Sequence, residues 1–414
     1  MASRLWPLRY FALLVIFALG LPRTSAASRT QTVLWNFSDT NGDGAYPAQN
    51  SLISDAHGNL FGVTVDGGGY SSCQNGCGVA FELSPNESGG YDETILHDFT
   101  GTDGDGANPY GGLVLDKHGN LYGTTLAGGV NRTGTVYELS PNSGGGWTET
   151  VLYSFGAVGS DDAEGPQSGL VLDSTGNLYG TAGGGGGNNG ACDCGTIFEL
   201  THSGDAWTET ILHRFRGGGG LYNGDGSGPN GLTFDALGDL YGSTAAGGNQ
   251  RQNYGTVFRL KRTGSGWAYK VLYSFTGPET GFRPEGNVVV DKAGRVYGTC
   301  YEGGGTVWEL TQSGTIFTLQ VLHDFSVDGS GPGGIAMDAS KNIFGATQGS
   351  SSTFYKLSKS GNAWNEVVLH AFTGGGDGAD PSLGTPLLEP NGNIFGLTDG
   401  GGDYGYGVVF ENTP

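Results

Sequence analysis

The chain has 414 residues, a formal charge of −21 and 82 glycines, while only 14% of its residues are charged. A surface of that sign repels phosphate groups, so the composition argues against binding to nucleic acid or to anionic lipid. The glycines recur at fixed points of a repeated phrase, which indicates turns between strands and argues against a disordered, low-complexity chain.

The first 27 residues predict a secretory signal peptide. Arg4 and Arg9 precede an apolar run from Phe11 to Leu21, and small residues follow as far as Ala27. This run is too short to span a bilayer, and no later stretch approaches the roughly 20 apolar residues that a span needs. Cleavage would leave 16 basic against 40 acidic residues, a charge of −24. We therefore expect an exported protein, extracellular or periplasmic, without a membrane span.

A phrase of four β-type segments recurs seven times through residues 28–414. In its second copy the segments are 112–116, 120–125, 134–139 and 149–155, each rich in β-branched and aromatic residues and bounded by Gly, Asn or Asp. A phenylalanine closes the fourth segment of every copy: Phe37, Phe99, Phe155, Phe215, Phe275, Phe325 and Phe372. Four antiparallel strands repeated seven times predict an all-β, seven-bladed β-propeller that forms a single domain.

The repeat is offset relative to the chain. It begins with a fourth-type segment at 32–37 and ends with a third-type segment at 408–411. We therefore expect the N-terminal strand to complete the last blade as its outer strand, which removes two exposed sheet edges. Long connections follow the second and fourth strands of each copy. In an up-and-down blade these share one face, where ligands usually bind.

The repeated phrase resembles a known family. Gly-Asn-Leu-Tyr-Gly-Thr-Thr at 119–125 and Gly-Thr-Val-Tyr-Glu-Leu at 134–139, with Ser-Phe and Asp-Gly-Ala-x-Pro upstream, resemble the GloVer tandem repeats of exported bacterial proteins, which are abundant in Gloeobacter and Verrucomicrobia. The first two segments are also similar to NHL-type propeller repeats, as at 169–173 and 176–179. The resemblance implies a secreted propeller, often with a C-terminal anchor; because Thr413-Pro414 directly follows the last predicted strand, we expect this chain to depart from the family there. It carries no catalytic residue over to this chain.

Most histidines and tryptophans fall on repeat positions, which favours structural roles. One position of the fourth strand holds His97, His213, His323 and His370, and elsewhere Trp35, Tyr153 and Tyr273. The start of the same strand holds Trp147, Trp207, Trp267 and Trp364. We therefore predict packing on the outer strands, with neither a catalytic histidine triad nor a histidine-rich zinc site on the variable face.

The first variable loop resembles the start of a calcium-binding loop. In Asp39-Thr-Asn41-Gly-Asp43-Gly, alternate oxygens could face one Ca²⁺ ion, and glycine permits the sharp turn. The twelfth position is Asn50, so the usual bidentate glutamate is missing. The alternative is an Asp-Gly turn with a solvated carboxylate.

Five cysteines suggest limited cross-linking. Cys73 and Cys77 share one glycine-rich loop and could close a small disulfide, as an oxidising compartment permits. Only one residue separates Cys192 from Cys194, where a bridge would be strained. The two pairs could bind a metal jointly only if their loops converged. Cys300 replaces a threonine of the repeat and is predicted to be buried and inert.

Two classes of function remain, and the first is a binding module. In that hypothesis an acidic loop face binds an extracellular glycan, peptide or surface partner, and the protein is a monomer. Tyrosines of the variable loops would stack against the ligand, with Tyr46, Tyr110, Tyr222 and Tyr301 as the candidates.

The second hypothesis is a carbohydrate-active hydrolase or lyase. Paired carboxylates at the mouth of the central channel would act as acid and base, and an arginine would neutralise a uronate. The candidates are Asp105, Glu164, Asp225 and Glu285 as acids, with Arg283 or Arg132 as the arginine. Because the acids fall mostly at repeated positions, the binding module is favoured.

Overall fold

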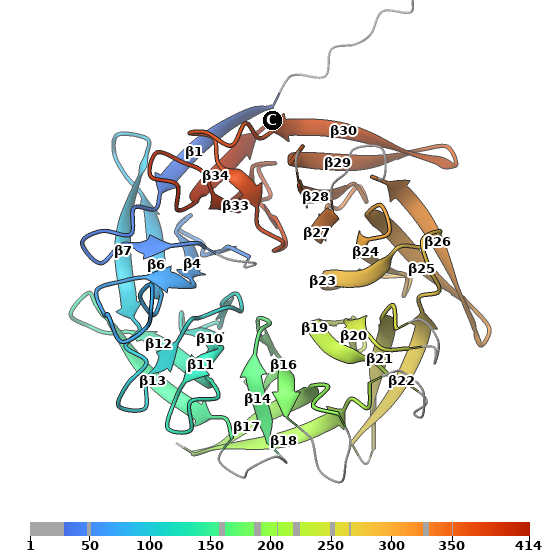
Figure 1. Cartoon of the computed structure of the whole chain (residues 1–414), viewed down its shortest axis with the longest axis horizontal. Helices are drawn as coiled ribbons and strands as arrows, with labels where there is room; N and C mark the ends of the chain where they lie inside the picture. The colour runs from blue at the N-terminus through green and yellow to red at the C-terminus, as the bar shows by residue number, and fades with distance from the viewer. Residues whose placement is uncertain are drawn as a thin grey trace, which may run out of the picture.

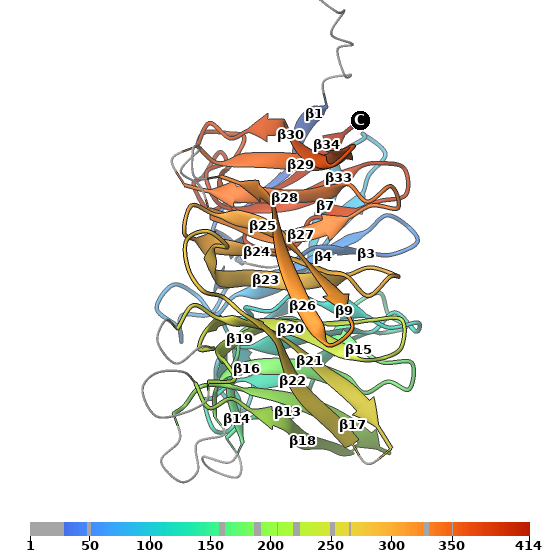
Figure 2. The same cartoon turned by 90° about the vertical axis from the view of Figure 1, so that its right-hand side faces the viewer.

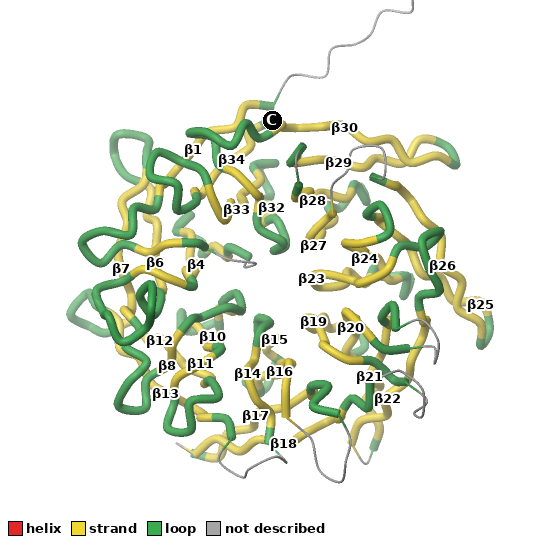
Figure 3. The backbone as a smooth tube through the Cα atoms, in the orientation of Figure 1, coloured by secondary structure: helices red, strands yellow, loops and turns green. Residues whose placement is uncertain are grey.

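The computed structural model describes residues 29–47, 51–156, 162–185, 192–204, 206–217, 224–248, 253–264, 266–325, 331–349 and 351–414. These residues form strands and loops only, without a helix that could cross a membrane (Figure 3). Antiparallel sheets are arranged as seven blades around a central axis (Figure 1). The predicted seven-bladed β-propeller is confirmed. The predicted signal peptide, residues 1–27, lies outside the described residues.

Blades 1 to 6 each run in chain order from the axis outward. In blade 2 the strands are β9 (Val114–Leu115), β10 (Leu121–Thr125), β12 (Thr135–Pro141) and β13 (Trp147–Ser154), which match the four predicted segments. Blade 1 consists of β3 (Ile53–Ser54), β4 (Leu60–Thr64), β6 (Val79–Pro85) and β7 (Tyr91–Asp98). Two short ribbons lie beside these blades: β2 (Gly44–Ala45) with β5 (Asp66–Gly67), and β8 (Gly106–Ala107) with β11 (Ala127–Gly128).

The next four blades repeat this order. Blade 3 consists of β14 (Ala163–Pro166) and β15 (Val171–Leu172), β16 (Leu178–Gly185), β17 (Thr196–Ser203) and β18 (Ala206–Arg214). Blade 4 consists of β19 (Ser227–Phe234), β20 (Leu240–Ala246), β21 (Thr256–Thr263) and β22 (Gly266–Ser274). Blade 5 consists of β23 (Phe282–Val290), β24 (Val296–Glu302), β25 (Thr306–Ser313) and β26 (Ile316–Asp324). Blade 6 consists of β27 (Gly331–Met337), β28 (Ile343–Gln348), β29 (Thr353–Ser360) and β30 (Ala363–Ala371).

Blade 7 joins the two ends of the chain. Its inner strands are β31 (Ala379–Pro381), β32 (Leu387–Leu388), β33 (Ile394–Gly400) and β34 (Val408–Thr413). Strand β1 (Thr30–Asn36) pairs antiparallel with β34 as the outer strand, with Thr30 opposite Thr413 and Asn36 opposite Val408 (Figure 1). The ring therefore closes as the offset of the repeat predicts, and neither β34 nor β1 is left as an isolated edge.

The phenylalanine that closes each copy packs between neighbouring blades. Phe99 at the end of blade 1 is fully buried, and its ring meets Tyr137 of blade 2 edge-on with centroids 5.0 Å apart. Phe155 meets Phe198 of blade 3 in the same way at 5.0 Å. These contacts remove large aromatic surfaces from water, and they hold each blade to the next.

The glycine in the phrase Tyr-Gly-Thr makes room for those aromatic rings. A Cβ atom on Gly123 would collide with the hydroxyl of Tyr137, and one on Gly180 would lie 2.5 Å from the ring of Phe198. The second strand therefore needs glycine here because the third strand places a large ring against it.

The connections between strands separate onto two faces of the ring (Figure 2). One face carries short hairpins such as 116–120, where the Asp116 carboxylate accepts hydrogen bonds from the backbone N–H groups of His118 and Asn120. The opposite face carries the connections that follow the second and fourth strands, and we call it the long-loop face. This separation agrees with the sequence interpretation.

Candidate functional site

A cavity of about 410 Å³ lies at the centre of the ring, and we call it the axial cavity. Its wall includes Leu126 and Ala245, which stand at the long-loop ends of second strands and so place the cavity at that face. The remaining wall comes mainly from first strands. There the residue after a recurring proline lines the cavity in four blades: Tyr110, Gln167, Asn230 and Glu285.

In six of the seven blades the residue before the same proline has a left-handed backbone. Tyr46, Asn108, Arg283 and Asp380 have φ between 49° and 57°, and glycine stands at this position in other blades. A non-glycine residue in that region is strained, more so before proline, and such strain is concentrated at functional sites. The repeat therefore fixes the backbone at the cavity rim while its side chains vary from blade to blade.

Close backbone packing makes the cavity wall rigid. The backbone N–H of Gly334 donates to Leu383 O at 2.6 Å, and the side-chain amide of Asn230 donates through Nδ2 to Pro284 O at 2.8 Å. A Cβ on Gly333 would lie 2.5 Å from the Cα of Leu383. Neighbouring first strands thus touch through their backbones, which leaves little freedom for the side chains between them to shift.

Arg283 is already neutralised by two carboxylates. Its Nε lies 2.9 Å from Glu285 and its Nη1 lies 3.1 Å from Glu302, while the guanidinium stands over the ring of Tyr301 at 5.6 Å. The hydrogen bond to Glu302, with the nearby charge of Glu285, raises the pKa of Arg283. Burial raises the pKa of Glu285 and outweighs the arginine beside it. The arginine therefore orients acidic groups and is not free to neutralise a uronate without releasing them.

A second carboxyl, Asp399, does not line the cavity, but its charge reaches Tyr110; it was not among the sequence candidates. Its Oδ1 is buried without a hydrogen-bond partner among the described residues, and its Oδ2 receives only a long contact of 3.4 Å from Gln348. Burial, followed by the charge of Asp380, raises the pKa of Asp399 to about 7. Burial and the charges of Asp399 and Glu285 together raise the pKa of Tyr110. The phenol is therefore within electrostatic range of both carboxyls.

The repeat contains the signal that would have identified Asp399. Asp399 follows the second strand's Leu-Thr pair at the position that is apolar, glycine, tyrosine or glutamine in the other copies: Val65, Leu126, Gly183, Ala245, Tyr301 and Gln348. It is the only acid at this position. An acid that stands out from its repeat position is a stronger indication of a site than an acid that recurs.

Asp105 and Asp225 lie away from the axial cavity. Asp105 faces His97 at 3.3 Å and Asp225 faces His213 at 3.1 Å, at the junctions between successive outer strands. Asp105 also accepts the backbone N–H of Thr100 at 2.7 Å. These acids hold the long connections against the outer strands. The histidines do occupy outer strands as expected, but their side chains reach the acidic groups of the long connections.

The other sequence candidates are dispersed. Glu164 is half-buried in β14 and does not line the axial cavity, and Arg132 is exposed in a long connection. Tyr46 packs edge-on against Tyr406 at 5.6 Å, beside a separate cavity of about 690 Å³. Tyr222 lies outside the described residues. Of the four tyrosines, Tyr110 lines the axial cavity, and Tyr301 lies under Arg283 at its rim.

The first loop forms a turn around Asp43. Its Oδ2 accepts the N–H and the hydroxyl of Ser38, both at 2.7 Å, and its Oδ1 accepts the N–H of Gly44 at 2.7 Å. Asp39 and Asn41 both have positive φ in the same turn. The hydrogen-bond donors of the Asp-Gly turn therefore satisfy the Asp43 carboxylate without an ion. Calcium at Asp39, Asn41 and Asp43 stays a prediction, and Asn50 lies outside the described residues.

The cysteines form two local pairs. The Sγ atoms of Cys73 and Cys77 are 2.00 Å apart, and those of Cys192 and Cys194 are 1.88 Å apart. Cys300 is free and buried, and burial raises the pKa of its thiol. No cysteine in the described ranges therefore presents an exposed nucleophile.

The repeated phrase also identifies the family. Residues 20–192 and 188–410 match the Gloeobacter/Verrucomicrobia repeat. The chain belongs to the Gloeobacter/Verrucomicrobia repeat family. This confirms the resemblance that the sequence indicated. No curated protein matches this family member.

Solved structures with the same fold are distant in sequence. A proposed 6-phosphogluconolactonase of Bacteroides fragilis shares 13% identity with this Gloeobacter/Verrucomicrobia repeat protein at a TM-score of 0.52, over 83% of this chain and 89% of that one. The extracellular domain of a proposed one-component system of Bacteroides thetaiotaomicron shares 11% identity at a TM-score of 0.55, over 93% of this chain and 40% of that one. At these identities the likeness shows a common propeller fold.

Proposed function

We propose that this Gloeobacter/Verrucomicrobia repeat protein is an exported binding module that takes a polar extracellular ligand, a glycan or a peptide, in the axial cavity. The observation that carries the proposal is the set of polar side chains that one variable repeat position supplies to the cavity: Tyr110, Gln167, Asn230 and Glu285. A few polar groups converging on a concave, rigid wall are typical of small-ligand sites.

The residue types suit a sugar better than an anion. Tyr110 offers an aromatic face, and the amides of Gln167 and Asn230 offer donors and acceptors, although Asn230 already donates to the backbone of Pro284. The charge of the chain and the paired state of Arg283 disfavour anionic ligands. The predicted signal peptide, the repeat family and the extracellular-domain neighbour support export.

A glycan and polysaccharide panel, assayed for binding with and without chelator, tests the proposal. For a glycan that the wild type binds, Tyr110→Ala and Gln167→Ala should each weaken binding by about 1–2 kcal/mol, or roughly five- to thirtyfold. Tyr70→Ala is the matched control because Tyr70 is exposed and lies outside the axial cavity. Equal affinity of wild type and both cavity variants would place the ligand elsewhere and refute this site.

Hydrolysis or elimination at the same cavity is a second candidate, supported by the two carboxyls of raised pKa that influence Tyr110. A carboxyl whose pKa lies near 7 can act as a general acid at neutral pH, as Asp399 could. In this version Glu285, which lines the cavity, and Asp399 are the candidate acids, in place of Asp105 and Asp225. The 6-phosphogluconolactonase neighbour adds sugar lactones to the panel as probes.

Turnover distinguishes the two candidates. If the cavity is catalytic, Asp399→Asn should abolish turnover while binding persists, and product should accumulate with the wild type. Binding without product formation across the glycan and lactone panel would support the binding module and exclude the enzyme for those substrates.

A further inference from the structure

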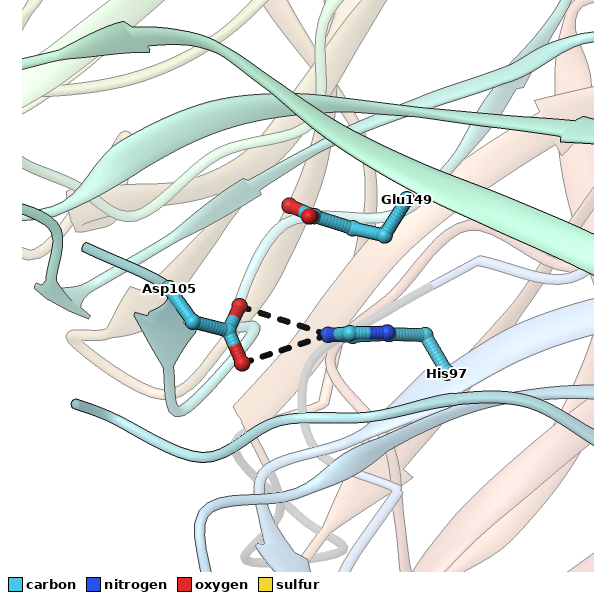
Figure 4. A group of neighbouring side chains, drawn as sticks. All are labelled: His97, Asp105 and Glu149. Atoms are coloured by element: carbon cyan, nitrogen blue, oxygen red, sulfur yellow. Dashed lines mark hydrogen bonds and ion pairs between the residues drawn. The ribbon is translucent and has the colours of Figure 1, made fainter. Parts of the chain in front are cut away.

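Away from the axial cavity, the junctions between blades repeat one arrangement of three side chains. The first side chain stands two residues before the closing phenylalanine of one blade, the second is an acid in the long connection that follows, and the third comes from the outer strand of the next blade. At the junction of blades 1 and 2 these are His97 on β7, Asp105 before β8 and Glu149 on β13 (Figure 4).

We propose that His97, Asp105 and Glu149 form a binding site for a divalent transition-metal ion, with zinc as the ion of choice. One donor atom from each of the three side chains lies within 4.8 Å of the other two. The His97 Nε2 lies 3.3 Å from both carboxylate oxygens of Asp105. One imidazole nitrogen and two carboxylates are ligands that zinc accepts, with water completing the coordination.

The distances require only a small closure. Bonds of about 2.0 Å in tetrahedral geometry place two donors roughly 3.3 Å apart. His97 and Asp105 already have that separation. Glu149 would have to approach by at most roughly 1.5 Å, which torsions of its long side chain can supply without moving the backbone.

Two of the three donors are held in place by the fold. The Asp105 carboxylate accepts the N–H of Thr100 at 2.7 Å and that of Gly106 at 2.6 Å. The ring of His97 packs edge-on against Phe99 with centroids 4.7 Å apart. An ion would therefore bind to His97 and Asp105 in their existing positions, and only the side chain of Glu149 would have to move. The loss of conformational entropy that opposes binding is small for this reason.

A second observation points to a missing partner. The Oε1 atom of Glu149 is buried and has no hydrogen-bond partner in the described ranges. A buried carboxylate oxygen without a partner is costly, and a cation between Glu149 and Asp105 would remove that cost and their mutual repulsion. The same ion would bridge the outer strands of blades 1 and 2 and the connection between them.

Two further junctions that the structure describes lack one of the three donors. At the junction of blades 3 and 4, Tyr269 stacks on His213 at 3.6 Å in the place of the third carboxylate. At the junction of blades 2 and 3, Tyr153 donates to Asp162 in the place of the histidine. Among the residues that the structure describes, the set at blades 1 and 2 is the only group of three such donors in reach of one another. These incomplete junctions are internal controls.

Metal titration of the tag-free protein tests the site. After treatment with a chelator, the wild type should bind one equivalent of Zn²⁺ by isothermal titration calorimetry, show a Co²⁺ absorption spectrum at the same stoichiometry, and gain thermal stability with Zn²⁺. Glu149→Gln and His97→Gln should each lower the Zn²⁺ affinity at least tenfold, or about 1.4 kcal/mol. His213→Gln, at a junction without the third donor, should bind Zn²⁺ as the wild type does.

Three results would overturn the proposal. These are no Zn²⁺ binding by the wild type, unchanged Zn²⁺ affinity in both Glu149→Gln and His97→Gln, or an equal loss in the His213→Gln control. Circular dichroism and the denaturation midpoint establish that each variant is folded. Because Glu149→Gln keeps the shape of the side chain, it remains informative if His97→Gln does not fold. Loss of Zn²⁺ binding here leaves glycan binding at the axial cavity untouched, so the two proposals fail independently.

Discussion

Replacing Glu93 by glutamine should stabilise the propeller at alkaline pH and have little effect at acidic pH. Glu93 lies on β7 at the junction of blades 7 and 1, and its Oε1 is buried without a hydrogen-bond partner among the described residues. Burial, together with the charge of Asp43 and a hydrogen bond to it, raises the pKa of Glu93 from 4.5 to about 8. The folded protein therefore holds a proton on Glu93 that the unfolded chain would release.

The sign and size of the effect follow from proton linkage. Because the folded pKa lies above the unfolded value, the favourable contribution of protonated Glu93 is complete below pH 4.5 and is lost as the pH rises to about 8. The difference between the folded and unfolded pKa values of Glu93 corresponds to a loss of at most about 5 kcal/mol in the free energy of unfolding. Partial solvent access lowers the expected loss to about 2–3 kcal/mol.

Glutamine reproduces the protonated form, since its amide can donate to Asp43 at every pH. Urea unfolding of wild type and Glu93→Gln, followed by circular dichroism at about pH 5 and about pH 9, should show an additional gain of about 2–3 kcal/mol for the variant at the higher pH. Asp92→Asn is the matched control because Asp92 is exposed on the same strand. A gain for Glu93→Gln that is the same at both pH values, or is shared by the control, would refute this reasoning.

Three further predictions concern the frame of the ring. Phe155→Ala should lower the free energy of unfolding by about 3–5 kcal/mol, because this fully buried ring joins blades 2 and 3. The control Ile316→Ala, at an exposed position, should change it by less than about 0.5 kcal/mol. Equal effects of the two substitutions in denaturant titrations would contradict the inter-blade role of Phe155. Gly123→Ala should lower the free energy of unfolding by about 1–3 kcal/mol, because the new Cβ collides with the Tyr137 hydroxyl. Adding Tyr137→Phe to this variant removes the hydroxyl and should restore part of the lost stability. A double variant no more stable than Gly123→Ala would show that the clash lies elsewhere. Deletion of residues 30–36 should open the ring and expose the edge of β34. Size-exclusion chromatography should then detect association or aggregation of the variant. A monomer with unchanged thermal stability would show that β1 is dispensable for closure.

Much of the fold follows from local sequence patterns. The closing phenylalanine recurs in all seven copies, and each copy must bury the same face against its neighbours, so copy number and strand order can be read from the chain. The offset between the segments at 32–37 and 408–411 determined how the ring closes. Closure depends only on which strand type stands at each end, so it too was available without coordinates.

The candidate sites were decided by the tertiary structure. Glu285 and Asp399 are far from Tyr110 in the chain, and their charges reach its phenol only because different blades meet around the axis. The same holds for His97 and Glu149, since the third donor at each junction comes from the next blade. The sequence by itself determined the blades and their order, because those depend on neighbours along the chain, whereas ring geometry decided which acids gain partners and which are left buried without one.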